Sequence, residues 1–179
     1  MSTKLKLLLH VCCAPCCTYP IKALQTEYEV ELFFYNPNIH PEEEYNTRLE
    51  EAREYANKIG VKFHELSYDS NIWFNSMKGL EDEPEGGARC EVCYRIRLGK
   101  TAQFAIANKV EHFATTLSTS PHKRAETINR VGQTIAEMHS LDFYEADFKK
   151  NDGFKIATKM ADEAGLYRQT YCGCIYSKR

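Results

Sequence analysis

The sequence has no apolar run near its N-terminus long enough for a membrane span or a signal-peptide core, because only a few apolar residues precede His10. It contains only 9 glycines and 6 prolines in 179 residues, which argues against a fibrous repeat and against disorder. The net charge of -2 gives no bulk attraction to nucleic acid, so an RNA partner would have to bind a local basic patch. We therefore expect a folded cytoplasmic protein that does not associate with a membrane.

A glycine-rich phosphate-binding loop is also missing after the first predicted strand, residues 6–11. Without a dinucleotide-binding fingerprint or a Walker motif, neither ATP nor NAD(P) is an expected cofactor. The position of such a loop is taken by the segment Cys12-Cys13-Ala14-Pro15-Cys16-Cys17. Functional residues of α/β proteins gather where a strand ends, so the chemistry is expected to depend on sulfur.

The eight cysteines form three groups, with four at positions 12–17, two at 90 and 93, and two at 172 and 174. A reducing cytoplasm disfavours structural disulfides, so this clustering indicates a metal, an iron–sulfur cluster or redox-active thiols. Two pairs with C-x-x-C spacing meet the ligand count of tetrahedral zinc and equally of a 4Fe-4S cluster; they are Cys13 with Cys16 and Cys90 with Cys93.

Spacing alone does not separate zinc from a cluster. The adjacency of Cys12 and Cys13 favours the cluster, because neighbouring side chains diverge and a cluster offers several iron atoms to receive them. The pair Cys172 and Cys174 differs in kind, since one glycine between two cysteines allows a small, strained disulfide that is readily reduced. The same pair could instead bind a second metal.

Strands and helices alternate along the chain. The predicted strands cover 6–11, 30–35, 61–68, 113–117 and 141–146, and the predicted helices cover 18–28, 41–59, 90–110, 120–139 and the segment from 154 to 164. This alternation predicts a three-layer α/β/α sandwich with a five-stranded, mostly parallel sheet. We expect one domain over 1–179 with an inserted surface loop at about 70–90, and with the cysteine-rich loop and C-terminal tail over the sheet edge.

Polar side chains follow several of the predicted strands and should converge on one edge of the sheet. The candidates for substrate binding are Tyr35, Asn36, Asn38, His40, Ser120, Lys149, Lys150 and Arg168, joined by the basic run His122-Lys123-Arg124. The basic side chains and a helix start at Ser120-Pro121 would suit a phosphate-bearing ligand, and the tyrosine would suit stacking on a base.

Six segments are identified together as similar to a known family: LLHVCCAPC, YNPNIHPEEEY, RCEVCYRIRL, TTLSTSPHK, DFKK and LYRQTYCGC. They resemble the signature blocks of the QueH epoxyqueuosine reductases. The resemblance implies a nucleotide-hydrolase-like (HUP-type) sandwich. It also implies an enzyme that reduces the epoxide of epoxyqueuosine, at the wobble position of tRNA, to give queuosine. This is the last step of queuosine biosynthesis, and the family uses an iron–sulfur cluster without cobalamin.

Carried over to this sequence, the resemblance places the cluster ligands at Cys12, Cys13, Cys90 and Cys93, and a redox pair at Cys172 and Cys174. The spacing argument prefers Cys16 to Cys12, so the fourth ligand stays open between these two. The sulfur left over is a candidate ligand for a second, mononuclear iron, together with one cysteine of the tail and Asp147. Cys17 is expected to be dispensable.

The expected enzyme is thus an oxidoreductase that takes electrons from an external low-potential donor, with His40 or Tyr35 as the proton donor. Two other classes of protein remain open at this point. A zinc-stapled RNA-binding module would use the same cysteines without redox activity, and a cytosolic disulfide reductase would use Cys172 and Cys174 without RNA.

Overall fold

The computed structural model describes residues 4–178, and its centre is a five-stranded parallel sheet. The strands are β1 (Leu5–Val11), β2 (Tyr28–Phe34), β3 (Phe63–Glu65), β4 (His112–Thr115) and β5 (Asp142–Phe143), in the spatial order β3-β2-β1-β4-β5. In the central pair, Leu9 lies beside Leu32 and Val11 beside Phe34. The predicted five-stranded sheet is confirmed, and every strand pair in it is parallel.

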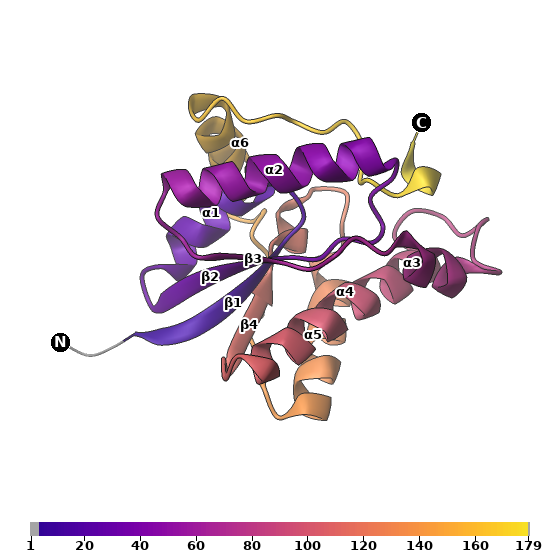
Figure 1. Cartoon of the computed structure of the whole chain (residues 1–179), viewed down its shortest axis with the longest axis horizontal. Helices are drawn as coiled ribbons and strands as arrows, with labels where there is room; N and C mark the ends of the chain where they lie inside the picture. Colours follow the sequence, from indigo (N-terminus) through magenta and orange to yellow (C-terminus); the bar gives the residue numbers. More distant parts are fainter. Residues whose placement is uncertain (1–3, 179) are drawn as a thin grey trace.

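Helices cover both faces of the sheet, as Figure 1 shows. The helices are α1 (Ala14–Leu24), α2 (Glu42–Lys58), α3 (Ser70–Met77), α4 (Ala88–Ala107), α5 (Ala125–His139) and α6 (Gly153–Glu163), with short 3-10 helices at η1 (Thr116–Thr119) and η2 (Ile175–Ser177). Side chains of β1 alternate between the two faces: Leu7 and Leu9 pack with α1 and α2, whereas Leu8 packs with α4 and α5. The predicted α/β/α sandwich is therefore confirmed.

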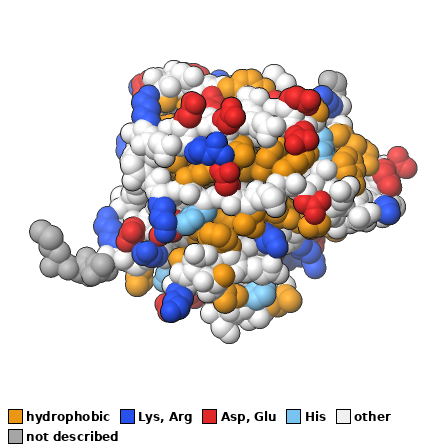
Figure 2. All heavy atoms as spheres, in the orientation of Figure 1, with side chains coloured by type: hydrophobic (Ala, Val, Ile, Leu, Met, Phe, Trp, Pro, Cys, Tyr) orange, Lys and Arg blue, Asp and Glu red, His pale blue; other side chains and the backbone are white. Residues whose placement is uncertain are grey.

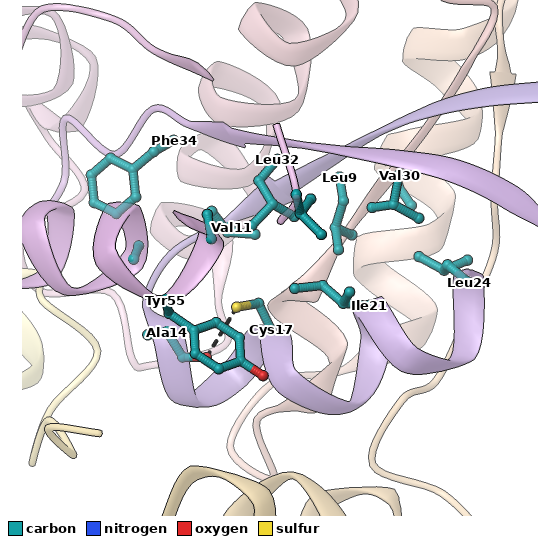
Figure 3. Packing of buried hydrophobic residues seen from close by; sticks show 14 of the residues in the cluster. Leu9, Val11, Ala14, Cys17, Ile21, Leu24, Val30, Leu32, Phe34 and Tyr55 are labelled. Atoms are coloured by element: carbon teal, nitrogen blue, oxygen red, sulfur yellow. Dashed lines mark hydrogen bonds between the residues drawn. The ribbon is translucent and has the colours of Figure 1, made fainter. Parts of the chain in front are cut away.

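The apolar cluster beneath α1 and α2 fixes the end of β1 relative to the first helix. Leu9 and Val11 of β1 contact Ile21 and Leu24 of α1 across this cluster, with Tyr55 of α2 closing one side (Figure 3). Burial of such side chains contributes about 1.5–3 kcal/mol each. The turn at 12–13 is thus held in place by packing on both sides of it.

Several predicted boundaries are wrong. The first helix begins at Ala14 rather than at 18, because Pro15 lies in its first turn, where a proline costs no hydrogen bond. Cys16 and Cys17 therefore lie on α1. Ser120 and Pro121 do not start a helix, since α5 begins at Ala125 and η1 occupies the end of the preceding loop.

The predicted irregular segment at about 70–90 contains α3, whose first turn is capped by Asp69 through a 3.1 Å hydrogen bond from the Asn71 backbone. The side chain of Phe154, on the first turn of α6, is 37% exposed. Its exposure leaves an aromatic ring at the surface beside the candidate site described below.

None of the helices within residues 4–178 has the length and apolar composition needed to span a lipid bilayer. On the face drawn in Figure 2, acidic side chains gather over α2, with basic ones between them. That face gives no continuous basic surface, so the basic groups that matter for an anionic ligand have to be sought at the carboxyl edge of the sheet.

Candidate metal centre and active-site cavity

The first group of thiols lies at the carboxyl end of β1. The sulfur atoms of Cys12, Cys13 and Cys16 lie within 4.8 Å of one another. Cys13 caps α1 with an extended backbone, and Cys16 follows within the first turn, so all three side chains meet on one side. Cys17 points the other way and donates a 3.0 Å hydrogen bond to the Ala14 carbonyl inside the apolar cluster (Figure 3).

The second group of thiols joins α4 to the tail. Cys90 and Cys93 lie on the first two turns of α4, and together with Cys172 and Cys174 they line a small cavity. The indole of Trp73 packs against Cys93 and Cys174 from α3. All eight cysteines are free thiols in this structure, so the tail pair is not joined in a disulfide.

Cys172 connects the two groups, because it also lines a larger cavity of about 630 Å³ that contains Cys12 and Cys16. This volume is in the range of small-molecule sites. Its lining includes four cationic side chains and one acidic one: Arg48, Lys123, Arg168, Lys178 and Glu85. A negatively charged ligand of nucleotide size would fit both the volume and the charge of this larger cavity.

The tail is fastened over α2 by a buried arginine. Arg48 donates hydrogen bonds of 3.1 Å to the carbonyls of Tyr171 and Cys172, and its Nε donates to Glu44 at 2.7 Å. The His40 backbone N–H donates to the Gly173 carbonyl at 2.8 Å. In Figure 1 the C-terminal segment runs alongside α2 before it turns down toward α3. These bonds fix the positions of the two tail cysteines.

A buried histidine shapes the loop that faces Cys12. Burial lowers the pKa of His10 to about 3, so the ring is neutral. Its Nε2 donates to the Tyr35 carbonyl at 3.2 Å, which leaves Nδ1 to accept from the Thr115 hydroxyl at 2.9 Å. Thr115 in turn accepts from the Leu117 backbone, and this turn brings the Thr116 hydroxyl to 3.9 Å from Sγ of Cys12.

The thiols of the first group share their protons unequally. Hydrogen bonds from Cys13 and Cys16 lower the pKa of Cys12 well below its usual range, and the same interactions raise the pKa of Cys13 and of Cys16. In the second group, burial raises the pKa of Cys93, and it raises that of Cys174 to about 11. The thiolate is the form of cysteine that binds a metal.

The buried donors around the small cavity match an anionic group. Trp73 Nε1, Arg89 Nε and Arg97 Nε are buried, and within residues 4–178 none of them has a hydrogen-bond partner. All three are N–H donors, which suits the thiolates and sulfides of an iron–sulfur cluster. The seven thiols of the two groups also supply the four ligands that a 4Fe-4S cluster needs, with three to spare. The residues present therefore fit a cluster.

The structure brings only some of the predicted substrate-binding residues to this site. Ser120 and Arg168 line the larger cavity. Tyr35, Asn36, Asn38 and His40 are buried and line neither of the two cavities described; Asp147, Lys149 and Lys150 lie in the loop after β5 and line neither of them. Asp147 instead forms an ion pair of 2.7 Å with Lys149 and one of 3.8 Å with Lys150.

Two buried members of this set, Asn36 and His40, have structural partners. Asn36 donates to the Val11 carbonyl at 2.9 Å and accepts from Arg97 at 2.7 Å. The His40 ring pairs with the Tyr68 hydroxyl at 2.9 Å and stacks on Phe74, and burial lowers the pKa of this histidine to about 4. These residues shape the loop after β2 instead of facing the larger cavity.

Reasoning from motifs missed several residues at the site, among them Trp73, Arg97 and Gln169. Trp73 lies in the segment that was predicted to be irregular, so no pattern pointed to it. Arg97 and Gln169 fall inside the segments RCEVCYRIRL and LYRQTYCGC, and their place in those segments was the available signal.

The fold and the site together define an α/β protein with three clustered thiols at the end of β1, two of which line a cavity that several cationic side chains also line. The family model for "Epoxyqueuosine reductase QueH" matches residues 7–179. Over 184 aligned residues the chain is 40% identical to an epoxyqueuosine reductase QueH of Streptococcus pyogenes serotype M1, covering 99% of this chain and 72% of that protein. It is 39% identical over 176 residues to that of Thermotoga maritima, covering 95% of this chain and 88% of the relative. The chain belongs to the QueH family of epoxyqueuosine reductases.

Two solved structures share the fold. A predicted subunit of tRNA methyltransferase from Methanocaldococcus jannaschii superposes with a TM-score of 0.58 at 14% identity, over 85% of this chain and 74% of that one. The U34-tRNA thiolase NcsA from Methanococcus maripaludis, solved with its [4Fe-4S] cluster, gives a TM-score of 0.59 at 11% identity, over 99% and 63%. At these identities the likeness establishes the fold.

Proposed function

We propose that this chain is an oxidoreductase that converts epoxyqueuosine in tRNA to queuosine with the help of an iron–sulfur cluster. The observation that carries the proposal is the opening of a seven-thiol site into a cation-lined cavity of about 630 Å³, in a chain of the QueH family. Removal of the epoxide oxygen as water takes two electrons and two protons. An external low-potential donor has to supply the electrons.

The proposed ligands of the cluster are Cys13, Cys90, Cys93 and either Cys12 or Cys16. Proximity supports the ligands at the end of β1, because the sulfurs of Cys12, Cys13 and Cys16 lie within 4.8 Å of one another. The α4 pair is included because Cys172 lines both the small cavity of Cys90 and Cys93 and the larger cavity of Cys12 and Cys16. When bound, the cluster would supply electrons one at a time, so a second redox centre is needed beside it. The remaining thiols, including Cys172 and Cys174, are proposed to bind a mononuclear iron or to act as a dithiol. A role for Asp147 as an iron ligand would require it to leave Lys149.

The cations around the larger cavity are proposed to hold the RNA. Arg168 and Lys178 would bind backbone phosphates, and the exposed ring of Phe154 would stack on a base next to the modified one. Lys123 lines both cavities and interacts with Cys172. Its ammonium group would stabilise negative charge that develops on the epoxide oxygen.

The test begins with anaerobic purification and measurement of iron, acid-labile sulfide and zinc, followed by EPR. The loaded protein is then incubated with epoxyqueuosine-containing tRNA and a low-potential reductant, and nucleosides are separated by mass. We expect about four iron and four sulfide per chain, as a 4Fe-4S cluster requires, and conversion to queuosine. The variant C13A should lose both cluster and conversion, whereas C17A should keep both, because Cys17 lies in the apolar cluster.

Other results would replace the proposal. A colourless protein that contains zinc and no sulfide would identify an RNA-binding module stapled by zinc. Disulfide reduction that persists in C13A, with no conversion of the nucleoside by the unmodified chain, would identify a disulfide reductase that uses Cys172 and Cys174.

A further inference from the structure

Arg97 is a buried cation on α4 that lacks a carboxylate partner. Its residue surface is 1% exposed, and no ion pair joins it to an acidic side chain in the described part of the chain. One hydrogen bond of 2.7 Å, from Nη2 to Oδ1 of the Asn36 side-chain amide, holds the guanidinium. Its Nε has no hydrogen-bond partner among residues 4–178. Burial of a full charge costs several kcal/mol unless another charge compensates it. Arg97 therefore requires an anion that the protein's carboxylates do not supply.

The position of Arg97 shows where that anion belongs. Arg97 follows Cys93 by one turn on the same face of α4, and it lines the small cavity together with both tail cysteines. Asn36, which holds Arg97, is itself anchored to the carbonyl of Val11, the residue just before Cys12. The guanidinium is thus fixed between the two thiol groups.

We propose that Arg97 is the buried counter-charge of the iron–sulfur cluster and a positioning residue that makes the cluster easier to reduce. This inference rests on the cluster of the proposed function. Reduction adds one electron from an external low-potential reductant and no proton, so the cluster becomes more negative by one charge. Arginine keeps its charge at all relevant pH values, and a fixed cation nearby stabilises the reduced state more than the oxidised one.

The test is an anaerobic redox titration of the loaded protein without RNA, with dithionite and mediators, read by EPR. The variant R97M removes the charge and keeps a long apolar side chain. We expect the ratio of reduced to oxidised cluster at a fixed potential to fall at least tenfold, which is about 59 mV for a one-electron couple. The variant R97K should restore most of this ratio. The matched control is R95M, two residues earlier on the same helix, where the arginine is 59% exposed and pairs with Glu91.

A second variant covers the case in which R97M does not retain its cluster. N36D keeps Arg97 but places a carboxylate against the guanidinium, so it should also lower the ratio of reduced to oxidised cluster at a fixed potential. A cluster of full iron and sulfide content with an unchanged ratio, in R97M or in N36D, would overturn the role of Arg97. Absence of iron and sulfide in the unmodified chain would overturn the proposed function as well, so the two failures are distinct.

Discussion

The side-chain amide of Gln169 donates a hydrogen bond of 2.9 Å to Sγ of Cys13, although the two residues lie 156 positions apart. This bond ties the tail directly to the first thiol group. With the proposed cluster bound, Cys13 would be a thiolate, and a hydrogen bond to a charged acceptor contributes about 1.5–3 kcal/mol, so we expect Q169L to lower single-turnover conversion by about tenfold or more. Q133L is the control, since Gln133 lies on α5 and donates a hydrogen bond to the exposed Glu145. A wild-type rate in Q169L would contradict this function of the bond.

Gly173 is required between the two tail cysteines. Its φ is +108°, and an added Cβ would lie 2.9 Å from Ile39 Cγ1 and 3.2 Å from Arg48 Nη1. G173A should therefore displace the tail, with a cost of about 1–3 kcal/mol from the backbone alone, faster proteolysis of the tail and loss of turnover. Gly165 also has a positive φ, of +70°, but nothing lies within 4 Å of its Cβ position. The prediction fails if G165A impairs turnover as much as G173A does.

Charge reversal of the cavity cations should weaken RNA binding. R168E and K178E are each expected to reduce affinity and to lower the salt slope of log K by about one, as measured by filter binding or anisotropy at several salt concentrations. K58E is the control, because Lys58 is exposed at the C-terminal end of α2 and lies outside the cavity lining. The sequence alone predicts the same loss for Lys149 and Lys150. Their pairing with Asp147 now predicts a smaller effect for K149E.

Glu31 should contribute to the acid limb of the stability curve, beside the buried neutral His10 and His40. Burial alone raises the pKa of Glu31, but hydrogen bonds from His64, Lys6 and Lys62 outweigh it and lower the pKa to about 2, from an ordinary 4.5. The unfolded chain therefore binds this proton more readily than the folded one. The stabilisation is complete above pH 4.5 and is lost as the pH falls toward 2.

We expect E31Q to cost about 1–3 kcal/mol at pH 7 and to lose less stability than the unmodified chain between pH 5 and pH 3. Urea unfolding at these pH values, with both proteins in the same cofactor state, gives the two curves. Parallel curves for E31Q and the unmodified chain would show that Glu31 does not carry the acid dependence.

The sheet could be predicted because its strands are encoded locally. Leu7, Leu8 and Leu9 form an apolar run that only a strand covered on both faces can bury, and the strand Tyr28–Phe34 repeats that pattern. Helix α3 could not be predicted in the same way. Its eight residues, SNIWFNSM, are too few and too mixed in polarity to show a 3.6-residue period.

The thiol groups were predictable from spacing, whereas their supporting residues depend on tertiary contacts. The loop after β2 resembles a ligand-binding loop, yet Asn36 turns inward to Val11 and Arg97, and His40 stacks on Phe74 of the unpredicted helix. A polar side chain after a strand can serve a ligand or a neighbouring backbone, and the choice is made by residues far away in sequence. The hydrogen bond between His10 and Thr115, which are 105 positions apart in the sequence, is one example.

The two apolar clusters have a consequence for how the enzyme matures. Each face of the sheet is covered by aliphatic and aromatic side chains, and the metal-ligand candidates border these clusters without forming their centres. A small zinc domain folds only when its metal binds, because it has no other core. The core members of the clusters on the two faces of this sheet include none of the proposed metal ligands, so we expect the sheet to fold without the cofactor. Chelation should then strip the centre and leave the sheet intact.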